Sequence, residues 1–188
     1  ANALVSVSND YFLSQAHRYS RVEDVAVGDL TGNGAPDIVI ANGCDDRTDS
    51  EYKAMWCQAN ILLINDGTGH FTPKPTSVIT QLSKNMSSGG VALVDANLDG
   101  MADVVVINNH HAPQVFLNDG LGDFTLDASY PLGDGTAGYD KSKSAVQPLA
   151  VTAGFFSSPI DFYILVTTKS ASDHRAVAQL FRLSCSAG

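Results

Sequence analysis

The sequence predicts an all-β protein made of β-propeller blades, each with four antiparallel strands, and about three such blades in the chain. Three observations predict this fold. An acidic, glycine-containing loop lies twice between two short apolar runs, in VAVGDLTGNGAPDIVIA and in VALVDANLDGMADVVVI. An Asn-Asp-Gly turn between apolar segments follows each loop. One unit therefore reads strand, loop, strand, connection, strand, turn, strand, which supplies the four strands of a blade.

The apolar runs beside the two loops are strands rather than helices. VEDVAV, DIVIA, VALV and DVVVI are short, rich in β-branched residues and without a helical period. A helix-flanked EF-hand loop would also end in a glutamate at its twelfth position, where this chain has Ile40 and Val106. Each loop therefore joins two strands.

The two loops have the donor pattern of a calcium site. Oxygen-bearing side chains occupy relative positions 1, 3, 5 and 9, which are Asp29, Thr31, Asn33 and Asp37 in the first loop and Asp95, Asn97, Asp99 and Asp103 in the second. Such hard oxygen donors suit Ca²⁺. A glycine at position 6 lets the backbone turn, so that the carbonyl of position 7, Ala35 or Met101, can face the same ion. The sequence predicts two Ca²⁺ sites, the second tighter because it has three carboxylates and the first only two.

The second repeated motif is a hairpin turn. Asn65-Asp66-Gly67 and Asn118-Asp119-Gly120 each stand between an apolar run and a second glycine followed by phenylalanine. Asn and Asp before Gly are strong hairpin signals, because the glycine accepts a positive φ.

These two motifs, recurring in the same order, resemble the FG-GAP/VCBS repeat family, the blade type of integrin α-subunit propellers. The resemblance covers residues 22–130. It implies a calcium-stabilised blade with the ion in the loop between the first two strands. It also implies adhesion to extracellular proteins or glycans through loops on one face of the propeller.

We interpret the chain as a single propeller segment. Its expected parts are residues 1–20, a strand completing another blade; 22–80, blade 1 with an insertion at 42–58; 88–130, blade 2; and 147–188, a degenerate and incomplete blade 3 without a calcium loop. Because closed propellers have four to eight blades, we expect the chain to join the rest of a longer propeller or other copies of itself. A head-to-tail contact between copies gives a ring if the rotation closes and a filament if it does not.

Covalent features favour a secreted or cell-surface protein. Cys44 and Cys57 could close the insertion with a disulfide, although two reduced cysteines are the alternative. Asn85 begins an N-glycosylation sequon. The sequence contains no apolar run of 18 residues, so it does not predict a membrane-spanning helix. The net charge of −9 argues against partners that are nucleic acids or anionic membranes.

The sequence favours binding over catalysis. The histidines lack metal-ligand spacing, no serine lies in a nucleophile elbow, and the loop acids are better explained as calcium ligands. We therefore expect a non-catalytic adhesion or assembly module, with a carbohydrate-binding lectin and an accessory domain of a secreted enzyme as alternatives. Candidate contacts to glycans or extracellular proteins are Tyr52, Trp56, Asn109, His110 and His111.

Overall fold

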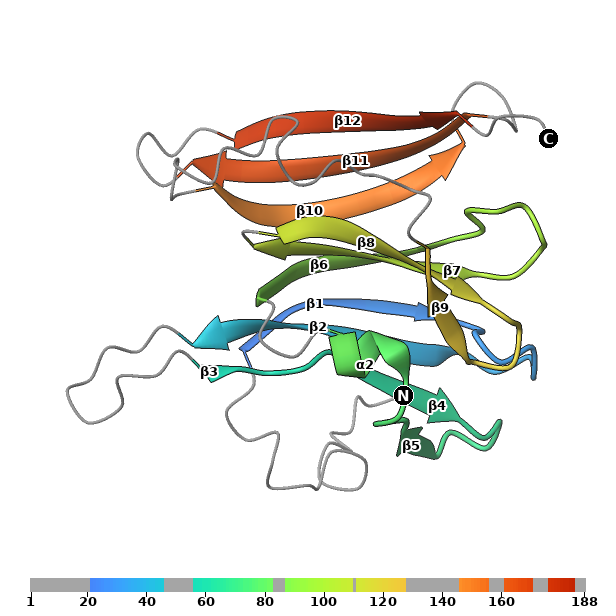
Figure 1. Ribbon diagram of the computed structural model, residues 1–188. Helices are drawn as coiled ribbons and strands as arrows, with labels where there is room; N and C mark the ends of the chain where they lie inside the picture. Colours follow the sequence, from blue (N-terminus) through green and yellow to red (C-terminus); the bar gives the residue numbers. More distant parts are fainter. Residues whose placement is uncertain are drawn as a thin grey trace, which may run out of the picture.

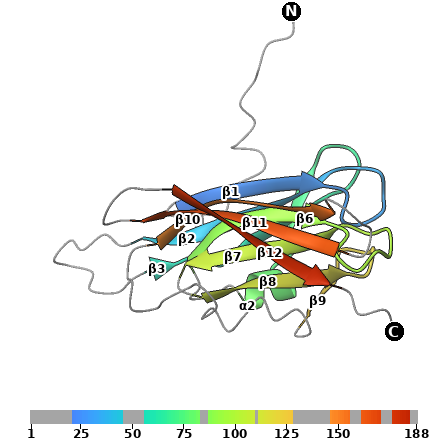
Figure 2. The ribbon, with the colours of Figure 1, turned by 90° about the horizontal axis from the view of Figure 1, so that it is seen from above.

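The computed structural model describes residues 21–45, 56–82, 87–109, 111–127, 146–155, 161–170 and 176–184. These residues form three antiparallel β-sheets stacked face to face (Figure 1). Viewed down the stack, the sheets overlie one another (Figure 2). The architecture is all-β, as the sequence predicts, and the sheets do not close into a barrel within the described residues.

Blade 1 is the sheet nearest the N-terminus. Its strands are β1 (Arg21–Gly28), β2 (Asp37–Asp45), β4 (Ile61–Asn65) and β5 (Phe71–Pro73), in the spatial order β1-β2-β4-β5. Each strand pairs antiparallel with its neighbour. This is the order that consecutive strands joined by hairpins give, and it confirms the four-stranded unit expected from the sequence.

Blade 2 repeats this arrangement. Its strands are β6 (Ser87–Val94), β7 (Asp103–Asn109), β8 (His111–Asn118) and β9 (Phe124–Leu126), in the order β6-β7-β8-β9. A short helix, α2 (Val78–Leu82), precedes blade 2 and contacts β4 and β9. The amide of Ile79 donates to the hydroxyl of Ser77 at the start of this helix, and Ile79 is fully buried. The sequence did not predict α2.

The third sheet has three strands in the described part of the chain, β10 (Val146–Phe155), β11 (Asp161–Ser170) and β12 (Ala176–Ser184). They pair antiparallel in that order. β10 lies against β6 and β7. Blade 2 is therefore the middle layer, between blade 1 and the third sheet (Figure 1).

The core between blades 1 and 2 consists of apolar side chains from one face of each sheet. Val39 and Leu62 of blade 1 and Val104, Val106 and Phe116 of blade 2 are fully buried in one cluster. Successive residues of a strand point to opposite faces of the sheet. In the continuous apolar run of β7, Val104 and Val106 therefore fill this core, and Val105 and Ile107 supply the opposite face of blade 2, which faces β10.

The insertion in blade 1 is partly a strand. β2 continues to Asp45, and β3 (Trp56–Cys57) pairs with this extension, so that Cys44 lies opposite Cys57 and Asp45 opposite Trp56. The insertion expected at 42–58 therefore contributes strand residues at both of its ends. The rest of the insertion with Tyr52, the expected strand in residues 1–20 and the sequon at Asn85 lie outside the described residues.

This pairing leads us to predict a disulfide between Cys44 and Cys57. Directly opposed residues in an antiparallel pair have Cα atoms about 4.5–5.5 Å apart, within the range that a disulfide spans. Non-reducing mass spectrometry should find the two thiols joined. Adding reductant should lower the free energy of unfolding by about 3 kcal/mol in a chain-entropy estimate.

A Cys44→Ser/Cys57→Ser double variant serves as the control, because reductant should not destabilise it further at this position. Free thiols at both positions in protein from an oxidising compartment would contradict the prediction.

Candidate metal centre in two acidic bends

The predicted ligands lie in two bends of the same construction. Bend 1 (residues 29–36) joins β1 to β2, and bend 2 (residues 95–102) joins β6 to β7. The Asn-Asp-Gly motifs form turn 1 (residues 65–70), between β4 and β5, and turn 2 (residues 118–123), between β8 and β9. Both bends and both turns lie at the same end of the stack, on the right of Figure 1.

Position 9 of bend 1 is a buried anchor. Asp37 is the first residue of β2 and is fully buried. One of its carboxylate oxygens accepts the amide of Leu30 in the bend, at 2.8 Å, and the other accepts the amide of Asn65 at the start of turn 1, also at 2.8 Å. One side chain therefore holds the bend and the turn together.

Asp103 plays the same part in blade 2. It is fully buried, and its two oxygens accept the amides of Ala96 at 2.7 Å and Asn118 at 2.8 Å. Desolvation by burial raises the pKa of this carboxyl, the two amides act in the opposite direction, and the nearby charge of Asp99 raises it further. The amides therefore offset part of the cost of burying the charge.

Position 1 of each bend faces the backbone of its own loop. Asp29 accepts the amide of Gly34 at 2.8 Å, and this bond is the main cause that lowers the pKa of Asp29. Asp95 accepts the amides of Asp99 at 3.0 Å and Gly100 at 2.9 Å. Gly34 and Gly100 both have a positive φ, which brings their amides to the carboxylate.

Positions 3 and 5 of bend 1 differ in how they are used. The hydroxyl oxygen of Thr31 is buried and has no hydrogen-bond partner. Asn33 accepts the amide of Ala35 at 2.7 Å, while its side-chain nitrogen donates to the carbonyl of Asn65 at 2.8 Å. Bend 1 therefore contains an unpaired buried oxygen at a predicted ligand position.

Positions 3 and 5 of bend 2 contact each other. The side-chain nitrogen of Asn97 donates to Asp99 at 2.8 Å, and the other oxygen of Asp99 accepts the amide of Met101 at 2.8 Å. All three residues are exposed. Bend 2 therefore presents the carboxylate of Asp99 at the surface, where a cation from solution can reach it.

The donor chemistry of both bends fits a hard cation such as Ca²⁺, since the side chains at positions 1, 3, 5 and 9 all offer oxygen. Among the residues that the structure describes, no group of three or more His, Cys, Asp or Glu side chains is gathered as a metal site. The position-9 acids are held by backbone amides, and each of their oxygens keeps a second lone pair for another partner. Thr31 fits best, because a bound ion would supply the partner that its hydroxyl lacks.

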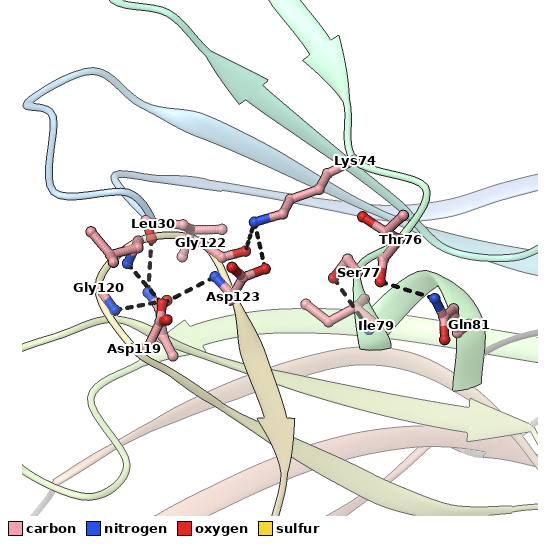
Figure 3. Close-up of polar contacts among 12 residues, drawn as sticks. Leu30, Lys74, Thr76, Ser77, Ile79, Gln81, Asp119, Gly120, Gly122 and Asp123 are labelled. Carbon is pink, nitrogen blue, oxygen red and sulfur yellow. Dashed lines mark hydrogen bonds and ion pairs between the residues drawn. The ribbon is translucent and has the colours of Figure 1, made fainter.

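The two blades are joined at turn 2. The side-chain nitrogen of Asn118 donates to the carbonyl of Leu30 in bend 1, at 3.0 Å, and to that of Ala102 in bend 2, at 2.9 Å. The ammonium group of Lys74 in blade 1 contacts the carbonyl of Gly122 at 3.0 Å and the carboxylate of Asp123 at 2.6 Å (Figure 3). One turn therefore contacts both candidate sites.

Sequence reasoning assigned only a turn-forming role to these asparagines. The sequence feature that could have indicated their side-chain contacts is that the same residue, asparagine, recurs at the end of the third strand in both units. Asn65 makes the corresponding contact within blade 1, donating to the carbonyl of Pro36 at 3.1 Å.

The predicted glycan or protein contacts lie elsewhere. Trp56 is in β3, and Asn109 and His111 flank the β7–β8 connection, whose backbone pairs Asn108 with His111. Because β2 and β7 start at the bends, these positions are at the opposite end of the stack from the candidate metal sites (Figure 1). His110 lies outside the described residues.

Stacked four-stranded antiparallel sheets, with an acidic bend between the first two strands, define the class of propeller-type blade proteins. Residues 29–106 match the family model of the FG-GAP-like repeat. The matched segment contains both bends and turn 1. Comparison with curated proteins found no match. In the described parts of the chain, no helix has the length and apolar character needed to cross a membrane.

Replacing the anchor in blade 2 should destabilise the fold without any metal. We predict that Asp103→Ala lowers the free energy of unfolding by about 3 kcal/mol, because it removes the buried carboxylate that accepts the amides of Ala96 and Asn118. Urea denaturation in EGTA measures the effect. Asp99→Ala is the control in the same bend; it removes an exposed acid and should cost less than about 1 kcal/mol. Equal costs would contradict the anchoring role.

In turn 1, the pKa of Asp66, which is not a candidate ligand, should depend on the side chain at position 68. Asp66 accepts the hydroxyl of Thr68 at 2.6 Å and its amide at 2.8 Å; the hydroxyl is the main cause that lowers the pKa of Asp66. Thr68→Val should raise this pKa towards its ordinary value, whereas Thr68→Ser should keep it low. NMR titration of the Asp66 carboxyl distinguishes these results.

Because the pKa of Asp66 is lowered in the folded state, this carboxylate contributes to the free energy of unfolding in a pH-dependent way. The folded state holds the charged form of Asp66 more strongly than the unfolded state does. The contribution is therefore present above the unfolded pKa and is lost as pH falls through the folded pKa. Thr68→Val should weaken this acid sensitivity, and an unchanged pKa in that variant would show that the hydroxyl does not cause the shift.

Proposed function

We propose that this chain is a non-catalytic, calcium-binding module of propeller-type blades that serves adhesion or structural assembly outside the cell. The observation that carries the proposal is the duplication of one donor arrangement. In both bends, position 1 faces the loop backbone, position 5 accepts the amide of position 7, and position 9 is a buried anchor. Both bends also combine this geometry with oxygen donors alone, as Ca²⁺ prefers.

Bound calcium would supply a divalent positive charge to each bend. In bend 2, Asp95 and Asp99 would hold it, with Asn97 between them and the carbonyl of Met101 as a further ligand. In bend 1, Asp29, Thr31 and Asn33 would take these positions, with the carbonyl of Ala35. Bend 2 offers more negative charge, so it should bind the ion more tightly.

The buried acids support a non-catalytic role. Asp37 and Asp103 each accept two backbone amides, which suits an anchor better than a group that must exchange protons. We propose the remaining acids of the bends as calcium ligands, and Asp37 and Asp103 keep a lone pair on each oxygen for the same ion.

Assembly is supported by the outward face of blade 1. Val25 and Val27 of β1 are 47% and 60% exposed. Counted from the bends, they correspond to Val91 and Leu93 of blade 2, which belong to the core between the two blades. An exposed face whose counterpart is buried against a neighbouring blade suggests a further blade as its partner, from the rest of a longer propeller or from another copy of this chain.

An extracellular setting suits this proposal. FG-GAP-like repeats are typically extracellular, and residues 29–106 match that family. Extracellular calcium modules bind the ion with dissociation constants of roughly 10⁻⁴–10⁻³ M, so weak sites of this kind fill only where calcium is abundant.

Calcium titration tests the proposal. Isothermal titration calorimetry should show two sites of roughly 10⁻⁴–10⁻³ M. Saturating calcium should raise the free energy of unfolding by about 1–3 kcal/mol over that in EGTA. Asp95→Ala should remove more of this gain than Asp29→Ala, because bend 2 has the larger ligand charge.

Magnesium at the same concentration is the control, since it demands a tighter octahedral geometry and should stabilise less. If EGTA and calcium give the same unfolding curve, the calcium proposal is wrong. Equal losses in the two variants would overturn only the ranking of the sites.

A further inference from the structure

Blade 2 differs from blade 1 at three equivalent positions around the bend and the turn. Leu98, Met101 and Leu121 are 49%, 36% and 72% exposed. The equivalent residues of blade 1, counted from Asp29 and Asn65, are Gly32, Ala35 and Thr68. The repeat can therefore form this bend and turn without large apolar side chains, and blade 2 exposes three of them to solvent. We call Leu98, Met101 and Leu121 the blade 2 rim.

Leu98 is held in an unfavourable backbone conformation. Its φ is 64°, and among the described residues it is the one residue other than glycine with a positive φ. Gly32 takes the same conformation in blade 1, with φ at 69°. A left-handed conformation disfavours a residue with a Cβ atom, and leucine gains no local hydrogen bond that would compensate, as asparagine can. Leu98 therefore costs stability where glycine would fit.

The side chain of Met101 connects the two segments that carry the rim residues, bend 2 and turn 2. A Cβ atom added at Gly120 would lie 2.7 Å from the sulfur of Met101, so this side chain extends from bend 2 over turn 2. Leu121 follows Gly120 directly, and Leu98 lies in the same bend as Met101. The rim therefore spans the bend and the turn of one blade.

The surroundings of the rim are acidic. Asp119 stands two residues before Leu121, is exposed and is not a predicted calcium ligand. Asp99, between Leu98 and Met101, is a predicted ligand, and Asp123 is paired with Lys74, so the charge of Asp119 is the one that remains when calcium is bound. Asp119 accepts the amide of Leu121 at 2.8 Å, which fixes its carboxylate beside the apolar side chain. Charge complementarity therefore favours a partner that carries positive charge next to apolar side chains.

We propose that the blade 2 rim is a docking surface for a protein segment that combines large apolar side chains with Lys or Arg. A strained and exposed leucine lowers stability in the free protein, so a bound partner is the physical reason to retain it. Apolar anchors dominate the energy of such contacts, and the Asp119 carboxylate beside the rim favours a positively charged partner. This proposal deepens the adhesive role proposed above and rests on it.

Panning a random-peptide phage library on the wild-type chain in calcium tests the proposal. Enriched peptides should carry at least two large apolar residues and at least one Lys or Arg. Synthetic copies should bind wild type in fluorescence anisotropy, and at least tenfold more weakly to the Leu98→Gly/Leu121→Thr double variant. That variant installs the blade 1 residues and keeps Met101, whose carbonyl is a predicted calcium ligand.

Two controls separate binding from folding. Leu98→Gly alone should not lower the melting temperature, because it relieves the left-handed leucine, yet it should weaken peptide binding. Val22→Thr changes an apolar side chain in β1 that is 51% exposed and belongs to neither proposed interface, and it should leave peptide binding unchanged. Calcium titration of the double variant should match wild type, so that loss of the docking surface and failure of the calcium sites give different results.

Several outcomes would overturn the proposal. They are the absence of any enriched motif, enrichment of acidic peptides, and equal binding of the enriched peptides to wild type and the double variant. Association of wild type, but not of the double variant, with phosphatidylcholine vesicles would assign the rim to a lipid surface instead.

Discussion

The structure of each blade depends on one buried carboxylate with two backbone amides. Asp37 and Asp103 begin the second strand of their blades and hold the preceding bend against the following turn. A buried charge is costly without such partners. Because the two amides come from segments far apart in the chain, each blade must bring its first two strands and its third strand together before this charge is satisfied.

This constraint also links one blade to the next. The turn fixed by Asp103 carries Asn118, whose side chain reaches the carbonyl of Leu30 in blade 1. Lys74 adds a charged contact from blade 1 to the same turn. Burial of the apolar core stabilises the contact between the sheets without fixing their relative orientation. These polar contacts fix how the sheets are placed on each other. The geometry of either bend is therefore tied to the contact between the blades.

The strands and bends were predictable because their causes are local. Short runs rich in β-branched residues and Asn-Asp-Gly turns act over a few residues, so the two four-stranded units follow from the sequence alone. The role of Asn118 was not predictable, because its acceptor Leu30 belongs to another blade. The pairing of β3 with β2 and the burial of Ile79 in α2 also depend on tertiary contacts. The backbone conformation of Leu98 was not predictable either, because leucine rarely adopts the positive φ that Gly32 has at the equivalent position of blade 1.

The contact from Asn118 to Leu30 gives the stack a direction. The turn of the later blade meets the bend of the earlier one, so the two ends of a stack expose unlike surfaces. Blades that add through the same contact must therefore be arranged head to tail, all in the same orientation. A two-fold symmetric dimer, which pairs a surface with itself, cannot reproduce this contact.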